Sequence, residues 1–438
     1  MKSVKVKKQT RALAGALSFP GDKSLSHRAI LFGSLAEGKS HFTNVLPGGD
    51  CVCTKEAFES LGVEIRTHSP TELTIHGRGL DSLEVPKKEI YLGNSGTSMR
   101  LLLGVLAGQP FEATLTGDAS LSSRPMRRVT DYLKKMGALV EGRDHANFAP
   151  LKIRGGKLKS IEANLPVPSA QVKSALLLAG LYADGKTTVT EPAKSRDHTE
   201  RFLKYFGGRI EEQGLRVSIQ GGQRLEAREF RIAGDISSAA FFMAMALLVP
   251  GSALEFKSVL DNPTRTGVLE VLKRMGVRFD NYRRGGLGGP EPAADFSLVS
   301  QPLKAFEIKK EELPPLIDEI PILTVLATQA RGRSIIHEAE ELRVKETDRI
   351  HSMVSTLSTL GAQIRAEGNS LFIEGPTPLK GAVVNSFKDH RTAMSLVVAG
   401  LVAQGETTVE DIECIDTSFP GFFELLKQTG AFFQTLTP

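Results

Sequence analysis

The sequence predicts an α/β protein of two domains, each with three repeats of strand, helix, strand, helix, strand and one further strand (βαβαββ). Three observations predict it: a pair of glycines that recurs six times, alternating Val, Ile and Thr after those glycines, and a length of 438 residues. Three repeats of roughly 65 to 80 residues make a domain of ordinary size, so six repeats make two domains.

In each repeat, one helix-like apolar run ends in the first glycine and a second, amphipathic run ends at the other. The first glycines are Gly38, Gly108, Gly185, Gly251, Gly332 and Gly405, and the second are Gly62, Gly137, Gly207, Gly276, Gly361 and Gly430. Glycine commonly closes helices because it adopts the left-handed conformation without strain. We therefore expect two helices in every repeat. The basic residues 1–23 lack the uninterrupted apolar core of a signal peptide and predict an opening strand of a cytoplasmic protein.

The first helix of each repeat is expected to begin on small polar or charged residues, at 21–28, 93–100, 168–174, 234–240, 317–323 and 388–394. A helix N-terminus exposes unpaired N–H groups and the positive end of the helix dipole, so it can bind an anion. Ordinary capping explains the Ser, Thr and Asn residues equally well. It does not explain the longer side chains beside them, which are Lys23, Arg28, Arg100, Gln171, Lys173, His390 and Arg391. Two domains that turned these helix starts toward one cleft would attract a multiply anionic substrate.

Composition excludes several classes of protein. Apolar runs such as 239–251 are too short to cross a bilayer, so no membrane partner is expected. The net charge of +5 is modest for this length and the chain has no Trp, which argues against a nucleic-acid partner. Three cysteines, two of them as Cys51-x-Cys53, do not form a zinc or disulfide pattern. No phosphate-binding loop, dinucleotide fingerprint or serine-hydrolase elbow occurs, so we expect no cofactor and no metal.

Charged residues outside the helix starts suggest a binding site. Arg124 precedes Pro125, a restricted position suited to a fixed anion contact, whereas Arg127 and Arg128 are expected on a solvated face. In 313–321, Asp318 and Glu319 stand between prolines in an apolar stretch, where a carboxylate can be tuned for proton transfer. The stretch 341–349 alternates in charge. It fits an i,i+4 salt-bridge ladder on one helix as well as it fits a binding site.

Several motifs resemble those of a known family: PGDKSLSHRAILFGSLAEGKS, LGNSGTSMRLL, SRPM, VPSAQVKSALLLAGL, ELRVKETDRI, KDHRTAM and SFPGFFELL. They look like the 3-phosphoshikimate 1-carboxyvinyltransferases, or EPSP synthases, from about residue 18 to the C-terminus. The resemblance implies an enolpyruvyl transferase fold of the inside-out α/β barrel type, with two domains around an interdomain cleft. One domain would contain residues 1–20 and 236–438, and the other residues 21–235.

The family reaction transfers the enolpyruvyl group of phosphoenolpyruvate to the 5-hydroxyl of shikimate 3-phosphate and releases phosphate, without a metal or cofactor. By resemblance, phosphoenolpyruvate is bound by Lys23, Asn94, Gly96, Arg124, Gln171, Arg349 and Arg391. Shikimate 3-phosphate is bound by Lys23, Ser24, Arg28, Ser169, Ala170, Gln171, Ser195, Asp318 and Lys345. Asp318 accepts the proton of the 5-hydroxyl, and Glu346 with Lys23 handles the proton at the enol methylene. The resemblance also implies a monomer and inhibition by glyphosate, provided that Gly96 leaves room for it.

Four positions depart from the pattern of some family members. Ala170 replaces a second phosphate-binding serine, Glu341 an asparagine, Thr417 a lysine and His198 a tyrosine. The sequence is also compatible with two other functions. One is enolpyruvyl transfer to UDP-N-acetylglucosamine, although residues 117–124 lack the cysteine usual in that loop. The other is an RNA-end-processing or RNA-binding protein built from similar repeats, which should show clustered basic or aromatic residues.

Overall fold

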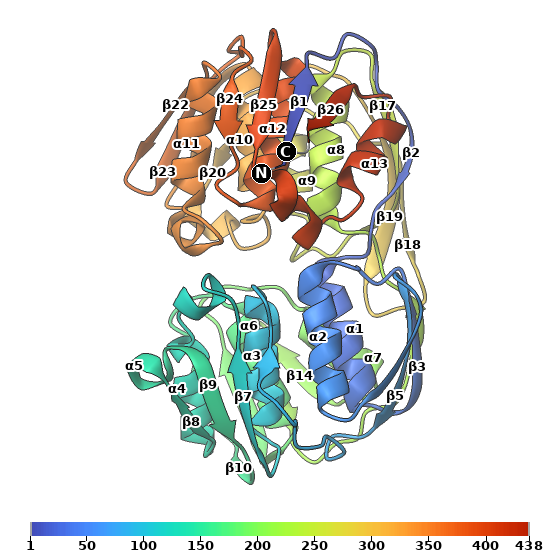
Figure 1. Ribbon diagram of the computed structural model, residues 1–438, viewed down its shortest axis with the longest axis vertical. Helices are drawn as coiled ribbons and strands as arrows, with labels where there is room; N and C mark the ends of the chain where they lie inside the picture. Colours follow the sequence, from blue (N-terminus) through green and yellow to red (C-terminus); the bar gives the residue numbers. More distant parts are fainter. Residues whose placement is uncertain (1, 437–438) are drawn as a thin grey trace. The chain divides into compact units, whose positions relative to one another are not determined.

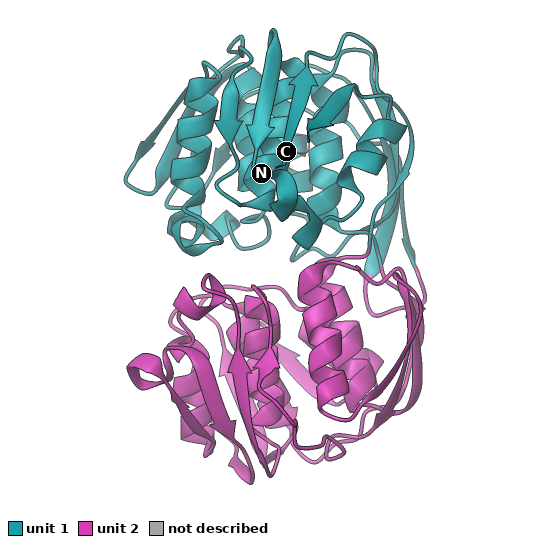
Figure 2. Cartoon of the chain, in the orientation of Figure 1, with its two compact units in different colours: residues 1–20, 233–286, 292–438 teal, residues 21–232, 287–291 magenta. Residues whose placement is uncertain are grey.

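The structure is a computed structural model that describes residues 2–436. The chain forms two compact units (Figure 2). Unit 1 contains the described residues of 1–20, 233–286 and 292–438, and unit 2 contains residues 21–232 and 287–291. Across residues 2–436, no helix is long and apolar enough to cross a membrane.

Unit 2 contains three four-stranded sheets. In spatial order their strands are β16 (Glu229–Arg231), β3 (Glu37–Thr43), β5 (Glu72–Arg78) and β4 (Glu64–Ser69); β6 (Ile90–Tyr91), β7 (Glu112–Thr116), β9 (Phe148–Arg154) and β8 (Leu139–Gly142); and β11 (Glu162–Asn164), β13 (Lys186–Thr190), β15 (Arg216–Gln220) and β14 (Ile210–Gln213). A two-stranded sheet pairs β10 (Leu158–Lys159) with β12 (Ala183–Asp184).

Unit 1 contains three more four-stranded sheets. Their strands are β2 (Ala14–Ser18), β17 (Ala253–Leu260), β19 (Pro292–Val299) and β18 (Asp280–Gly286); β20 (Glu307–Ile308), β21 (Gly332–Ile336), β23 (Ser370–Gly375) and β22 (Gln363–Glu367); and β24 (Val383–Asn385), β25 (Glu406–Glu410), β1 (Ser3–Lys7) and β26 (Phe433–Leu436).

All six four-stranded sheets share one pairing pattern. The first two strands, in the orders above, run parallel, and each later pair is antiparallel. In four sheets a buried helix connects the parallel pair, as in a βαβ unit. The α/β class predicted from the sequence is confirmed.

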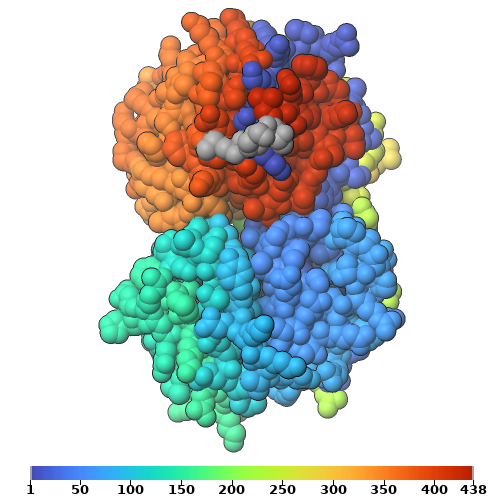
Figure 3. All heavy atoms as spheres, viewed as in Figure 1, coloured from blue at the N-terminus to red at the C-terminus, as the bar shows by residue number. Residues whose placement is uncertain are grey.

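Segments far apart in the chain complete three of these sheets. β1 lies between β25 and β26, so the N-terminal strand fills a place in the C-terminal sheet (Figure 1). In Figure 3, blue N-terminal atoms accordingly lie among red C-terminal ones in unit 1. β2 precedes the first helix of unit 2 but pairs with β17 of unit 1, whereas β16 precedes the first helix of unit 1 but pairs with β3 of unit 2. The expected opening strand is therefore present, as two strands that belong to different sheets.

Two kinds of helix accompany the sheets. The first helices of the repeats are α1 (Lys23–Leu35), α3 (Gly96–Leu106) and α6 (Ala170–Gly180) in unit 2, and α8 (Ile236–Leu248), α10 (Ile320–Gln329) and α12 (His390–Val402) in unit 1. They are buried over most of their length, and α8, α10 and α12 contact one another. All six begin within the stretches that the sequence indicated, so that prediction is confirmed.

The second helices bury one face only. They are α2 (Gly49–Ser60), α4 (Arg127–Met136), α7 (His198–Tyr205), α9 (Gly267–Arg274), α11 (Arg349–Thr359) and α13 (Phe422–Gln428). The second glycine of every pair follows them with a positive φ, from +85° at Gly62 to +109° at Gly137, which confirms their role as helix stops. The first glycines do not end helices. The first helices stop two to five residues earlier, and Gly38 and Gly332 already lie in β3 and β21.

The remaining helical segments are short. They are α5 (Arg143–Ala146), η1 (Leu121–Ser123), η2 (Lys310–Glu312), η3 (Glu340–Val344) and η4 (Ile412–Thr417). In α5, Asp144, His145 and Ala146 all have a positive φ, so this segment is a left-handed turn.

Candidate active site

The start of α1 supplies the first group of predicted binding residues in unit 2. Asp22 caps the helix through Leu25 N (3.0 Å), which fixes Lys23 and Ser24 on its first turn. Lys23 Nζ lies 2.5 Å from Asp50 Oδ2 at the start of α2. No sequence pattern indicates this partner, because Asp50 is 27 residues away and in a different helix.

Arg28 is buried one turn further along α1. It donates to Thr199 Oγ1 (2.8 Å), Ser174 Oγ (3.0 Å) and the Ser24 carbonyl (3.1 Å). Burial lowers the pKa of Arg28 to about 10, although the carboxylates of Glu200, Asp22 and Glu291 partly offset this effect. The guanidinium therefore remains charged at neutral pH.

Arg100, near the start of α3, and Arg124, directly after η1, both approach Gly96. Arg124 Nη2 donates to Asn94 Oδ1 (2.8 Å), in the turn before α3. A Cβ on Gly96 would lie 3.1 Å from Arg100 Nη1 and 3.2 Å from Arg124 Nη1, so both guanidinium groups approach this glycine closely. Arg124 has the extended backbone expected before a proline (φ −82°, ψ 135°). Arg127 and Arg128 are exposed, as the sequence predicted.

The start of α6 lies beside α3 (Figure 1). Gln171 bridges the two helices, because its Oε1 accepts from Arg100 Nη1 and its Nε2 donates to Thr97 Oγ1 (2.8 Å). Ser169 is the N-cap of α6, and Ala170 is the first helical residue. Ser195 is buried and donates its hydroxyl to Glu191, a residue that the sequence reasoning did not single out.

Unit 1 gathers a second group of predicted residues around Asp318. One carboxylate oxygen, Oδ1, lies 3.4 Å from Lys345 Nζ and 3.5 Å from Arg349 Nη1. The other, Oδ2, lies 3.7 Å from Arg265 Nη1. Arg391 Nη1 donates to the backbone carbonyl of Asp318 (3.0 Å). Three cations, Lys345, Arg349 and Arg265, therefore surround this one carboxylate.

Arg349 is the most heavily paired cation of this group. It is 1% exposed, and it contacts Asp389 Oδ2 (2.9 Å) and Glu346 Oε2 (2.6 Å) as well as Asp318. Burial by itself would lower the pKa of Arg349, but the carboxylates of Asp389, Glu346 and Asp318 outweigh burial and raise the pKa above its ordinary value. The Arg349 side chain is thus a permanently charged group with a fixed orientation.

The interpretation of 341–349 as a salt-bridge ladder on one helix is wrong. η3 ends at Val344, Lys345 is extended, and α11 begins only at Arg349. Asp348 caps α11 through His351 N (3.0 Å), which interrupts any helical spacing between Lys345 and Arg349. Both cations instead contact Asp318, a residue about 30 positions earlier in the chain.

Arg265, which precedes α9, was not among the predicted site residues. It is 2% exposed, it donates to Ser237 Oγ (2.8 Å) and it lies 3.7 Å from Asp235 Oδ1 at the start of α8. Ser237 in turn donates to Glu319. No signal in the sequence marked Arg265, because its partners lie on α8 and before α10.

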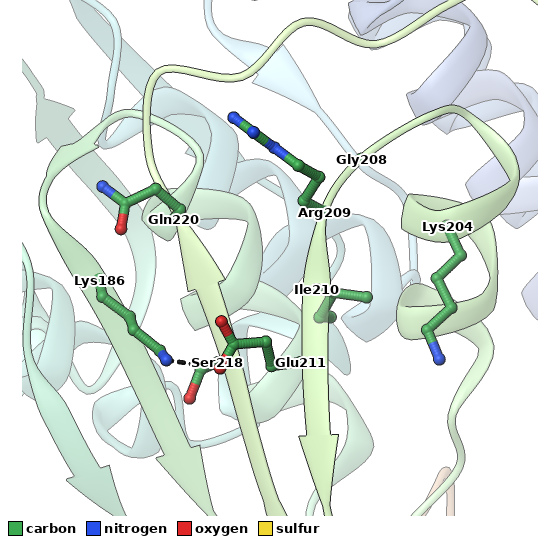
Figure 4. A pocket seen from close by; sticks show the side chains of 8 residues that line it. All are labelled: Lys186, Lys204, Gly208, Arg209, Ile210, Glu211, Ser218 and Gln220. Atoms are coloured by element: carbon green, nitrogen blue, oxygen red, sulfur yellow. Dashed lines mark hydrogen bonds and ion pairs between the residues drawn. The ribbon is translucent and has the colours of Figure 1, made fainter.

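Unit 2 contains two other polar places, and the second includes Glu291, which acts electrostatically on Arg28. A shallow hollow of about 470 Å³ lies over β14 and β15, where the exposed Lys186 and Glu211 form an ion pair (Figure 4). Asp197, His198 and Glu291 cluster closely enough to bind a metal ion. Arg201 already contacts both carboxylates, Asp197 Oδ1 at 2.9 Å and Glu291 Oε2 at 3.6 Å, so a side-chain cation serves that group.

Comparison with known proteins identifies the family. A family model described as EPSP synthase (3-phosphoshikimate 1-carboxyvinyltransferase) matches residues 7–426. The chain belongs to the EPSP synthase family. A 3-phosphoshikimate 1-carboxyvinyltransferase of Bacillus cereus (strain ATCC 10987 / NRS 248) is 48% identical over 428 residues, which cover 98% of this chain and 99% of the relative. One of Bacillus thuringiensis (strain Al Hakam) is 49% identical over 416 residues, 95% of this chain and 96% of the relative. A solved EPSP synthase from Acinetobacter baumannii matches with a TM-score of 0.90 and 42% identity, over 100% of both chains.

The four departures from the pattern of some EPSP synthases have different surroundings. His198 begins α7, and its Nδ1 lies 2.7 Å from Glu291 Oε1. Thr417 ends η4 and donates to the Cys414 carbonyl (2.7 Å), and Glu341 is exposed in η3. Ala170 is partly buried at the start of α6.

Proposed function

We propose that the residues gathered in the two units together perform the 3-phosphoshikimate 1-carboxyvinyltransferase reaction, which is the activity of this chain as an EPSP synthase. The observation that carries the proposal is the arrangement around Asp318. The Asp318 carboxylate has Lys345 Nζ and Arg349 Nη1 within 3.5 Å, and Arg391 Nη1 donates a hydrogen bond to the backbone carbonyl of Asp318. A base among cations suits a reaction that removes a hydroxyl proton while two anionic substrates are bound.

Phosphoenolpyruvate carries a phosphate and a carboxylate, and both suit arginine. We assign its binding to Lys23, Asn94, Gly96, Arg124, Gln171, Arg349 and Arg391. The contacts of Arg124 with Asn94 and of Arg349 with Asp389 hold these guanidinium groups in fixed orientations before a substrate arrives. Such preorganisation reduces the side-chain conformational entropy that would otherwise be lost when the substrate binds.

Shikimate 3-phosphate is assigned to Lys23, Ser24, Arg28, Ser169, Ala170, Gln171, Ser195, Asp318 and Lys345. Arg28 and Ser24 would bind its carboxylate. Ser169, at the N-cap of α6, would bind its phosphate together with Ser195, because a helix N-terminus favours an anion. At Ala170 the side chain offers no hydroxyl, so only the backbone can contribute there.

The proton transfers are assigned to Asp318 and Glu346, with Lys23 beside the enol carbon. Asp318 would accept the proton of the 5-hydroxyl as that oxygen attacks phosphoenolpyruvate. Glu346 would exchange the proton at the methylene carbon, and its contact with Arg349 Nη2 holds the carboxylate in place. The positive charge of Lys345 and Arg349 would stabilise the negative charge that develops during addition.

We propose two domains, residues 1–20 with 236–438 and residues 21–235, each with three βαβαββ repeats, and substrates that bind where both sets of residues reach them. The shared pairing pattern of the six sheets supports the repeats. We propose further that the enzyme is a cytoplasmic monomer.

The test is phosphate release from purified protein with phosphoenolpyruvate, without added metal or nucleotide. Shikimate 3-phosphate and UDP-N-acetylglucosamine are compared as acceptors. Release with shikimate 3-phosphate alone is the expected result. Release with UDP-N-acetylglucosamine alone, or with neither acceptor, would refute the proposal.

A further inference from the structure

We propose that Glu191 is a positioning residue for the phosphate of shikimate 3-phosphate. In this proposal Glu191 holds Ser169 and Ser195 in place. When the substrate binds, the Ser195 hydroxyl stops donating its hydrogen bond to Glu191 and donates it to a phosphate oxygen instead. The inference rests on the proposed phosphate-binding roles of the two serines.

Glu191 lies directly after β13 and is 4% exposed. Its Oε1 accepts from Ser169 N (3.2 Å) and from the Ser195 hydroxyl. Its Oε2 accepts from Ser195 N (3.4 Å) and from Lys173 Nζ (2.6 Å). One carboxylate therefore joins the N-cap of α6 to the segment that precedes α7, 26 residues further along the chain.

The Ser195 hydroxyl has a single proton, so it can donate only one hydrogen bond at a time. In this structure Glu191 receives that bond. A phosphate dianion has only acceptor oxygens, so Ser195 can donate to it only by turning away from Glu191. Glu191 retains three donors after this change: Ser169 N, Ser195 N and Lys173 Nζ. Its carboxylate therefore stays hydrogen-bonded, so the change of acceptor by Ser195 costs little free energy.

A carboxylate beside a phosphate site would repel the ligand unless its charge were balanced. Lys173 is 1% exposed, and its Nζ lies 2.6 Å from Glu191 and 2.7 Å from Glu200 Oε1. Burial raises the pKa of Glu200 although Lys173 opposes that change. Burial by itself would lower the pKa of Lys173, but the carboxylates of Glu200 and Glu191 outweigh burial and raise it. Glu200 also interacts electrostatically with Arg28. Lys173 and Arg28 are therefore the cations that balance the charge of Glu191 and Glu200.

In the experiment, each of the two glutamates that contact Lys173 is replaced by the isosteric glutamine. Glu191→Gln and Glu200→Gln each remove one carboxylate from the same lysine, but only Glu191 contacts the serines. We expect Glu191→Gln to raise the KM for shikimate 3-phosphate at least tenfold, with the KM for phosphoenolpyruvate and kcat within threefold of wild type. We expect Glu200→Gln to change all three constants by less than threefold. The surface variant Glu211→Gln, on the shallow hollow of unit 2, serves as the control for removing a paired glutamate.

A double-mutant cycle tests whether Glu191 acts through Ser195. We expect each of Glu191→Gln and Ser195→Ala to raise the KM for shikimate 3-phosphate. In the double variant, the rise should be clearly smaller than the product of the two single effects, because residues that share an interaction do not act independently. Glu191→Asp keeps the charge opposite Lys173 but withdraws it from the serines, so it should raise the same KM. This second variant tests the proposal even if Glu191→Gln does not fold.

Three results would overturn the inference. The first is an unchanged KM for shikimate 3-phosphate in both Glu191 variants of an active enzyme. The second is an equal rise in Glu200→Gln, which would mean that Lys173 pairing alone matters. The third is multiplicative effects in the cycle. A wild-type enzyme that released no phosphate with shikimate 3-phosphate would instead refute the proposed function, and the inference with it.

Discussion

Replacement of His27 by asparagine should remove a defined part of the pH dependence of stability. His27 lies on α1 between Ser26 and Arg28, is 1% exposed, and contacts Thr54 Oγ1 through Nδ1 (2.7 Å). Burial is the main cause that lowers the pKa of His27 to about 3; Asp50 opposes the change, and Lys23 and Arg28 add to it. Asparagine can keep a polar atom near the Nδ1 position but does not titrate.

The size of the effect follows from two pKa values, about 3 in the folded protein and about 6.5 in the unfolded chain. The folded state excludes the proton that the unfolded state accepts. The stability from neutral His27 is therefore fully present above pH 6.5 and is lost as the pH falls toward 3. Between pH 7.5 and pH 5.0, this one group should lower the free energy of unfolding by about 2 kcal/mol.

The assay is urea unfolding of wild type and His27→Asn at several pH values from 7.5 to 5.0. A difference in the free energy of unfolding that is the same at every pH reports the altered packing of the variant. Only a change of that difference with pH reports the titration of His27. We expect wild type to lose about 2 kcal/mol more than the variant over this range. Exposed His145→Asn is the control and should follow wild type. Parallel pH profiles for wild type and His27→Asn would refute the reasoning.

Three further changes test the active site. Arg349→Lys should reduce kcat/KM for phosphoenolpyruvate by about 100-fold in steady-state assays, because an ammonium group cannot reproduce the contacts with Asp389, Glu346 and Asp318; a loss below tenfold would contradict this. Gly96→Ala places a methyl group 3.1 Å from Arg100 Nη1 and 3.2 Å from Arg124 Nη1. It should therefore raise the KM for phosphoenolpyruvate roughly 10-fold and raise the inhibition constant of glyphosate, in an otherwise sensitive enzyme, at least as much. An unchanged inhibition constant would exclude this crowding. Asp318→Asn should reduce kcat by about 100-fold to 10,000-fold while the dissociation constant for shikimate 3-phosphate, from calorimetry, stays within tenfold; near-normal kcat would remove Asp318 from proton transfer.

Local signals in the sequence were enough to locate most helices. Asp22, Ser95 and Asp389 cap α1, α3 and α12 with side chains that the sequence displays directly before each apolar run. Gly137 and its counterparts mark helix ends because their left-handed φ is a property of the residue itself. These features depend on neighbours within four positions, so no knowledge of the fold is needed to find them.

Features that depend on distant partners were not predictable. Arg265 meets Asp318 53 positions later in the chain, and Lys23 meets Asp50 on another helix. The sheets assigned to β2 and β16 depend on pairing across the whole chain, with β17 and β3. The error at 341–349 has a related cause: the alternating charges suit a helix, but the cap at Asp348 restarts the helix and turns Lys345 and Arg349 toward Asp318.

The cations assigned to the substrates share one feature of design. Lys23 lies against Asp50, Arg349 against Asp389, and Arg391 against the Asp318 carbonyl, so each is oriented by an oxygen of the protein itself. These oxygens reduce the attraction for anions, but they remove most of the side-chain freedom that binding would otherwise have to restrict. The same principle applies to Ser169 and Ser195, which Glu191 holds through hydrogen bonds. If these assignments hold, we expect selectivity for substrates with both a phosphate and a carboxylate to come from fixed donor positions more than from net positive charge.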